Sequence, residues 1–341
     1  MSDVKSHDGG FTIIELMVSM AILALISIYL TGMLTQQNRA YTVVDQVTEA
    51  QSNTRAISQI LEREVRASGG LAPEGAAVCG VDNTDEPDVL YVTDMDPLQI
   101  TPEMNYALGG EIESGFTGGG TDTIRLIAPG GVVLDGRAFY DLDGDGTGDA
   151  DFRPGAGVIV VDPKNAMRGT VCGVIVDAGV NVAGRTIEVD FSGSTGTLAA
   201  KPPGRPTSPL VAIPAHRYMV DADNRLMRDE MVLADDVEDF QVAYFFDRDD
   251  DGDPTEVGEV FGSATGAVYV ANALNMDNEE LRQVRFNFVT RARRPDPSFT
   301  GATFQATENR AAVAGTDGFR RRLYRAEVRL RNIGRRWREG A

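Results

Sequence analysis

The sequence is poor in the residues that most enzymes and metal centres use. It has two histidines, His7 and His216, and two cysteines, Cys79 and Cys172, in 341 residues. The two cysteines give no zinc-binding spacing, and the chain lacks a Gly-x-Ser-x-Gly elbow, a Gly-x-x-x-x-Gly-Lys-Ser/Thr loop and an HExxH helix. His216 lies in a strand-like segment, where a lone histidine is more often structural than catalytic. We therefore expect no enzymatic activity.

Basic residues are also scarce before the first apolar run. Residues 1–10 contain Lys5 against two aspartates, and residues 11–34 are apolar except for short polar side chains and one charge, Glu15. About 20 apolar residues suffice for a helix to cross a bilayer. An ordinary secretory signal has a basic region before its apolar run and a small-residue cleavage site after it, and both are missing. The run is therefore predicted to be a membrane helix.

Glu15 is the informative residue of this run. A carboxylate costs roughly 2.5–3.5 kcal/mol at the bilayer centre and less near an end, so such a residue usually has a function. The sequence Gly10-Phe11-Thr12-Ile13-Ile14-Glu15 resembles the class III signal of type IV prepilins. This resemblance implies that a prepilin peptidase cuts between Gly10 and Phe11 and methylates the new Phe11 amine. It also implies that Glu15 faces the free amine of a neighbouring subunit during assembly. The alternative is a plain signal anchor in which Glu15 is incidental.

An amphipathic pattern continues beyond the membrane run. Apolar or small residues recur in steps of three and four, the spacing of one helix face, at Val43, Val47, Ala50, Thr54, Ile57 and Leu61. The sequence Ser68-Gly69-Gly70 provides a helix stop. We expect one helix from about Phe11 to about Ala67. It is either the stem of a pilin or a soluble coiled coil, and the attached membrane run favours the stem.

The remaining residues, 71–341, show the short, turn-bounded apolar segments of a β-rich region. We predict long surface loops at residues 113–122 and 193–207. In the last strand, Ala326, Val328 and Leu330 alternate with charged residues, which indicates one buried face. The predicted strands are 89–93, 123–128, 157–161, 170–176, 186–191, 210–213, 240–246, 284–289 and 323–331.

These segments define an α+β fold, with a long N-terminal helix packed on a large β-rich head. The expected organisation is a leader at 1–10, a transmembrane or filament-core helix at 11–35, an amphipathic stem at 36–68 and the head at 71–341. Segments of the second half, residues 216–220, 225–228, 237–244, 282–293, 319–324 and 328–332, resemble PilW-type minor pilins.

This second resemblance implies a role in assembly. Minor pilins of this type form a complex in the inner membrane that primes polymerisation of the major pilin and forms the pilus tip. The implied partners are other minor pilins, the major pilin, a large tip adhesin and the prepilin peptidase. The head would face the periplasm before assembly and the cell surface afterwards. The alternatives are a J-type pseudopilin of a type II secretion system and a membrane-anchored, calcium-dependent adhesin.

Charge argues against a nucleic-acid partner. The net charge of −19 would repel a polyanion. Residues 282–341 nevertheless contain 15 arginines and five acidic residues, a net charge of about +10. Three readings are open: these arginines neutralise the acidic region at residues 221–259 of the same head, they contact an acidic neighbouring pilin, or, less consistently with the overall charge, they bind DNA.

Two acidic loops carry carboxylates at alternate positions, a pattern that suits calcium. The first has Asp141, Asp143, Asp145 and Asp149, but Phe152 stands where an EF-hand has its bidentate glutamate. A solvated acidic turn explains this loop equally well. No cofactor other than calcium is suggested.

The second loop has Asp247, Asp249 and Asp251, followed by Glu256 and Glu259. It is the weaker calcium candidate, because a polar hairpin turn after the preceding strand explains it as well.

The membrane topology favours a Cys79–Cys172 disulfide over two free thiols, because a head in an oxidising periplasm normally has its cysteine pair bridged. Closing a loop of about ninety residues stabilises by on the order of 4 kcal/mol in the chain-entropy model.

Overall fold

The computed structural model describes most of the helix and the core of the head. The described residues are 12–69, 77–93, 106–109, 116–117, 120–127, 151–162, 169–192, 197–198, 210–264, 266–267, 280–296, 299, 303–304, 306–314 and 317–330. The chain divides into two compact units, Met1–Gln51 and Ser52–Ala341.

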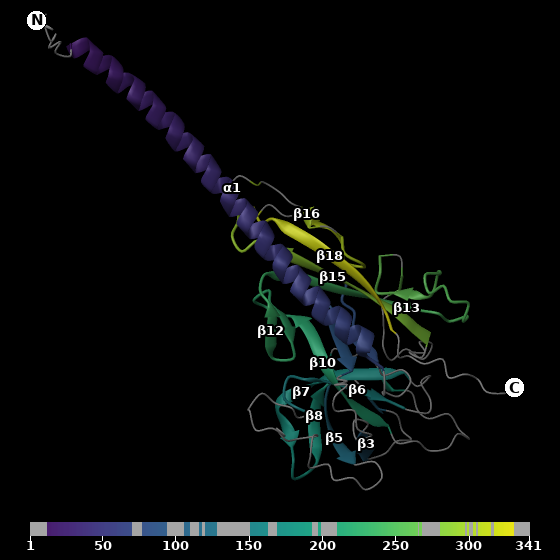
Figure 1. Cartoon of the computed structure of the whole chain (residues 1–341). Coiled ribbons are helices and arrows are strands. Elements are labelled where there is room, and N and C mark those ends of the chain that lie inside the picture. The colour runs from purple at the N-terminus through teal and green to yellow at the C-terminus, as the bar shows by residue number, and fades with distance from the viewer. Residues whose placement is uncertain are drawn as a thin grey trace, which may run out of the picture. The chain divides into compact units, whose positions relative to one another are not determined.

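One helix, α1 (Ile13–Ala67), forms the described part of the first unit and continues into the second (Figure 1). Its sequence contains no proline and one glycine, Gly32, so nothing in it breaks the hydrogen-bond ladder. The helix ends at the predicted stop, where Gly69 adopts the left-handed conformation with φ 81°. The long N-terminal helix is therefore confirmed.

The predicted apolar stripe becomes the buried face of α1 within the second unit. Thr54, Ile57, Leu61 and Val65 are all buried, and the last three belong to the larger of two hydrophobic clusters in the head. The side chains of Val47 and Ala50 lie outside the described residues, and Val43 is half-buried. The packing of this helix segment on the head is thus observed from Thr54 onward.

The larger sheet of the head is antiparallel and closes on itself. Hydrogen-bonded pairs connect β10 to β3, β3 to β5, β5 to β8, β8 to β7, β7 to β6, and β6 back to β10. Its ten strands are β1 (Val78–Val81), β2 (Val89–Thr93), β3 (Tyr106–Gly109), β5 (Thr121–Ile127), β6 (Gly157–Val161), β7 (Thr170–Asn181), β8 (Thr186–Asp190), β10 (Val211–Val220), β11 (Leu226–Arg228) and β12 (Met231–Ala234).

This ring of strands separates two cores. In β6, Val158 and Val160 belong to the smaller cluster, whereas Ile159 and Val161 belong to the larger cluster that also contains the α1 residues. Successive side chains of a strand point to opposite faces, so a continuously apolar strand serves both cores. This explains why β6 reads as an unbroken run of Val and Ile.

A second antiparallel sheet has the order β14-β13-β15-β18 (Figure 1). Its strands are β13 (Val237–Phe246), β14 (Val260–Phe261), β15 (Leu281–Arg291) and β18 (Arg321–Arg329). The alternation predicted for the last strand is confirmed: Val328 and Leu330 are buried and Ala326 is half-buried, whereas Arg325 and Glu327 are exposed.

All nine predicted strands are present, some of them longer than predicted. The predicted loops at 113–122 and 193–207 were partly wrong, because they contain the paired strands β4 (Phe116–Thr117) and β9 (Thr197–Leu198). Both strands have only two residues, too few for a period-two pattern to be detected. A further pair consists of β16 (Thr303–Phe304) and β17 (Val313–Ala314).

The structure contains the Cys79–Cys172 disulfide, with a Cα–Cα distance of 6.1 Å. It joins β1 to β7, and both cysteines are buried in the larger cluster. The covalent link therefore connects two strands of the larger sheet that do not pair with each other.

Candidate assembly and ion-binding sites

The N-terminal end of α1 is closed by Thr12 and Glu15. The Thr12 backbone N–H and the Thr12 hydroxyl each donate to Glu15 Oε2 at 3.0 Å, while the Glu15 backbone N–H donates to Thr12 Oγ1 at 3.3 Å. This reciprocal arrangement is a capping box, which satisfies N–H groups that have no partner within the helix. In the single chain, then, the Glu15 carboxylate turns back toward the start of its own helix.

The surface of α1 beyond Glu15 is apolar and exposed. The most apolar stretch within Ile13–Asp45 has none of its residues buried within the structure. The helix is long and apolar enough to cross a membrane. The exposed large apolar side chains of its first part are Ile13, Ile14, Leu16, Met17, Val18, Met20, Ile22, Leu23, Leu25, Ile26, Ile28, Tyr29, Leu30, Met33 and Leu34.

Several predicted site residues lie outside the described residues. These are Gly10 and Phe11 of the cleavage and methylation signal, together with the first acidic loop at Asp141, Asp143, Asp145 and Asp149. Both sites remain predictions from the sequence.

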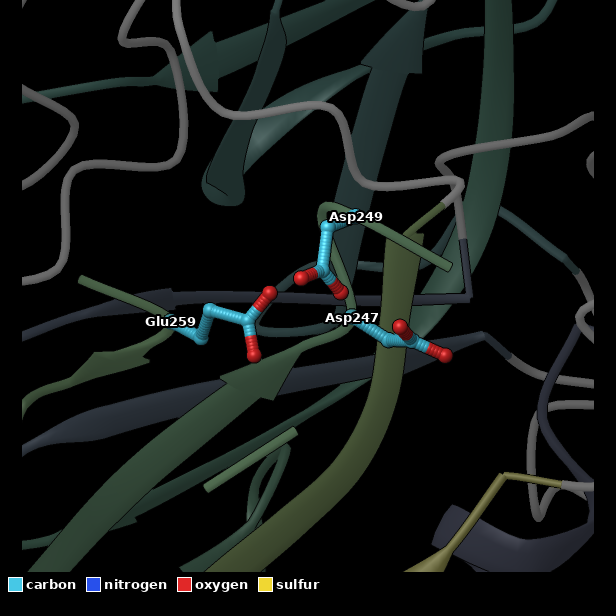
Figure 2. A group of neighbouring side chains, drawn as sticks. All are labelled: Asp247, Asp249 and Glu259. Atoms are coloured by element: carbon cyan, nitrogen blue, oxygen red, sulfur yellow. The ribbon is translucent and has the colours of Figure 1, made fainter. Parts of the chain in front are cut away.

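The second acidic loop is described, and it connects β13 to β14. Asp247, Asp249 and Glu259 each place one carboxylate oxygen within 4.8 Å of the oxygens of the other two. Figure 2 shows the carboxylates of Asp249 and Glu259 facing each other. Asp251 does not join this group but lies in a second, fully exposed one with Asp249 and Glu256. The structure thus groups Asp247 and Asp249 with Glu259 and not with Asp251.

Like charges affect the exposed part of this loop. The neighbouring carboxylates of Asp251 and Asp249 raise the pKa of Glu256 above its usual value. A concentration of negative charge strong enough to disfavour ionisation also attracts cations.

Glu64, a largely buried carboxylate of α1, contacts the head. Arg228 Nη2 lies 2.9 Å from Glu64 Oε1, and the Tyr218 hydroxyl donates to Glu64 Oε2. Burial and the adjacent Glu64 carboxylate raise the pKa of Tyr218, so this hydroxyl stays protonated as a donor. The helix is therefore fixed to β10 and β11 by charge as well as by apolar packing.

His216 is a structural part of the same network. Its Nε2 lies 2.6 Å from Arg228 Nη2 and its Nδ1 lies 2.8 Å from Asp229 Oδ2. Because arginine can only donate, Nε2 accepts and Nδ1 carries the proton that is donated to Asp229. Burial opposes the Asp229 charge, but hydrogen bonding from His216 and the nearby Arg153 hold the pKa of Asp229 below its usual value. The contacts of this network thus fix the orientations of the Arg228, His216 and Asp229 side chains.

Most of the C-terminal arginines that the structure describes pair with carboxylates of the head. Arg282 lies 3.5 Å from Asp247, Arg291 lies 3.2 Å from Glu238, and Arg310 pairs with buried Asp239. These contacts favour the first of the three readings, neutralisation of the acidic region at residues 221–259.

Sequence reasoning missed Glu64 and Arg228, and it mentioned Glu259 only as a residue that follows the acidic loop. Glu64 is one of several polar residues in the stem, and no local pattern marks it as buried. Glu259 could have been found from its position immediately before the short apolar strand β14, because a loop that returns to the sheet brings its last residue beside its first.

Comparisons with known proteins give two family matches. Residues 215–332 match the type IV pilus-assembly protein W family, and residues 5–31 match the prokaryotic N-terminal methylation motif. A type IV-like pilin from Thermus thermophilus is similar over 86% of this chain and 97% of its own, with 11% sequence identity and a TM-score of 0.28. No curated protein matches the chain.

Proposed function

We propose that the chain is a type IV pilin of the PilW type, and that it acts as a minor pilin that primes pilus assembly and forms part of the tip complex. Its two family matches support this proposal. The observation that carries this proposal is the presence of both matching regions in one chain, the second of them on an exposed, membrane-length helix. A filament subunit needs both parts, a helix for the filament core and a head that selects neighbours.

Processing creates the assembly-competent form. The prepilin peptidase cuts after Gly10 and methylates the Phe11 amine, and the helix keeps the protein in the inner membrane with its head in the periplasm. The Cys79–Cys172 disulfide supports this location, because disulfides persist in oxidising compartments.

Glu15 changes partner when subunits dock. In the single chain its carboxylate accepts hydrogen bonds from Thr12, which are local and uncharged. A Phe11 amine from a neighbouring subunit would bring a full positive charge to the same carboxylate in surroundings of low dielectric, where opposite charges attract far more strongly than in water. The exchange would favour the assembled form.

The head restricts the position of the subunit. The second unit comprises Ser52–Ala341, and repeating a head of this size at every helical step would crowd the shaft. A rare component at the tip, in contact with other minor pilins, the major pilin and a large adhesin, avoids this problem.

Complementation of a deletion strain tests the proposal. We expect mature protein that begins with methylated Phe11, measured by mass spectrometry, and a loss of surface pili on deletion, counted by electron microscopy. Wild type should restore the pili and Glu15→Gln should not. Asp45→Asn is the matched control, since it removes an exposed carboxylate of the same helix outside the apolar run.

Three results would contradict the proposal. Mature protein that still begins at Met1 would expose no amine near Glu15. A deletion that stops hydrolase secretion and leaves pili intact would indicate a pseudopilin, and one that removes only adhesion would indicate an anchored adhesin.

A further inference from the structure

The turn between β13 and β14 buries more negative charge than its protein partners satisfy. Glu259 has only 5% of its surface exposed and Asp247 only 4%. Glu259 Oε1 accepts a hydrogen bond from the Arg248 backbone N–H at 2.7 Å. Glu259 Oε2 is also buried, and it has no hydrogen-bond donor among the residues that the structure describes. A buried carboxylate oxygen without a partner is strongly unfavourable, so a ligand is expected there.

The carboxylates of Asp247 and Asp249 lie close to that of Glu259. One oxygen each of Asp247, Asp249 and Glu259 lies within 4.8 Å of the other two (Figure 2). Arg282 Nε lies 3.5 Å from Asp247 Oδ2 and offsets only one of the three negative charges. Without a further cation, this group would keep two unbalanced charges close together.

The backbone holds these side chains in place. The Asp247 backbone N–H donates to the Glu280 carbonyl at 2.8 Å, and the Phe246 N–H donates to the Glu259 carbonyl at 2.9 Å. Asp247 and Glu259 are thus fixed by neighbouring strands, and Gly252, at φ 91°, allows the chain to turn between them. A site that is held by a sheet is arranged before its ligand arrives.

We propose that Asp247, Asp249 and Glu259 bind a calcium ion. The ligands are all carboxylate oxygens, which hard cations prefer, and no nitrogen or sulfur ligand takes part. Calcium binds oxygens at about 2.3–2.6 Å, so ligands on opposite sides of the ion lie up to about 5 Å apart, a span that accommodates the observed separations. Magnesium, at about 2.0–2.1 Å, would require all three oxygens within about 4.2 Å.

The ion would join the two ends of the turn. Asp247 follows β13 directly and Glu259 precedes β14 directly. One ion that contacts both would therefore link the first and last residues of the turn. The exposed group of Asp249, Asp251 and Glu256 shares Asp249 with the site and would draw cations toward it from solution. This inference is independent of the proposed role in pilus assembly.

The test measures thermal unfolding of the full chain in detergent micelles after treatment with EDTA. Adding Ca²⁺ up to about 10 mM, a range suited to weak extracellular sites, should raise the Tm of the wild type by roughly 2–4 °C. Mg²⁺ at the same concentration should raise it by less than half as much. Glu259→Gln should abolish most of the calcium-dependent rise and weaken calcium affinity at least tenfold, measured by titration calorimetry.

Two further variants keep the test decisive. Asp249→Asn changes an exposed side chain and should also weaken calcium affinity at least tenfold, so the test does not depend on the folding of Glu259→Gln. Asp250→Asn is the matched control: it removes the same charge from the same loop, lies outside the group, and its left-handed φ of 62° suits asparagine as well. It should keep the wild-type shift.

Either of two results would overturn the proposal. If the wild type shows no calcium-dependent shift, a proton or a water molecule satisfies Glu259. If Glu259→Gln or Asp249→Asn shifts as much as the wild type, the ion binds elsewhere in the chain.

Discussion

Leu61→Ala is the substitution that most directly tests whether α1 is part of the head's core. The Leu61 side chain is completely buried, and its neighbours on the same helix face, Ile57 and Val65, have at most 1% of their surface exposed. Replacing a buried leucine by alanine typically lowers the free energy of unfolding by about 2–5 kcal/mol, with the larger values where the surroundings cannot collapse into the cavity. Because these helix neighbours and the strands around them are tightly packed, we expect a loss of about 3–4 kcal/mol.

The measurement is thermal unfolding of the full chain in detergent, followed by the near-ultraviolet circular dichroism of the buried tyrosines Tyr218 and Tyr244. At about 2 °C per kcal/mol for a domain of this size, Tm should fall by roughly 6–8 °C. Leu23→Ala is the matched control: it makes the same deletion in the same helix at an exposed position and should change Tm by less than about 1 °C. Equal shifts in the two variants would refute the idea that the stem completes the core.

Two further predictions concern buried charge. Arg228→Gln leaves Glu64 without its cation and should lower the free energy of unfolding by about 3 kcal/mol, measured by urea denaturation; adding Glu64→Gln should recover part of this loss, and additive losses would contradict a direct ion pair. Burial raises the pKa of Asp88 to about 8, although the backbone N–H groups of Asn83 and Val242 donate to it. Between pH 4 and pH 8 the folded chain therefore holds a proton that the unfolded chain has lost, so stability should fall as pH rises, by up to about 1.4 kcal/mol per pH unit. Asp88→Asn should remove this part of the slope, and an unchanged slope would show that Asp88 is ionised.

The elements that could be predicted from the sequence are those whose apolar residues recur at a regular spacing or are bounded by turn residues. The long helix was visible because its apolar half has no breaks and its second half repeats every three or four residues. The main strands were visible because Gly, Pro, Asn or Asp bound them. The prediction of which α1 residues are buried was correct from Thr54 to Leu61, since spacing alone determines which residues share a helix face.

Contacts between distant segments could not be predicted in this way. Glu64 and Arg228 are 164 positions apart in the sequence, and their ion pair exists only because the helix packs beside β10 and β11. The closure of the larger sheet depends on β10 pairing with both β3 and β6, a choice among strands that no local pattern records. Glu259 likewise comes close to Asp247 only when the turn has folded back.

The two halves of α1 explain why two of its carboxylates, Glu15 and Glu64, behave differently. Glu15 lies among exposed apolar side chains, and in the single chain it has only the first turn of its own helix as a partner. A capping interaction of this kind is worth about 0.5–2 kcal/mol, which is small enough for a charged partner in low dielectric to replace. Glu64 lies on the face of α1 that packs against the head and already has Arg228 and Tyr218 as partners, and removing Arg228 would leave its largely buried charge unpaired. Under the proposed function, Glu15 would thus exchange its local partner for a charged one, whereas Glu64 would keep its contacts with the head.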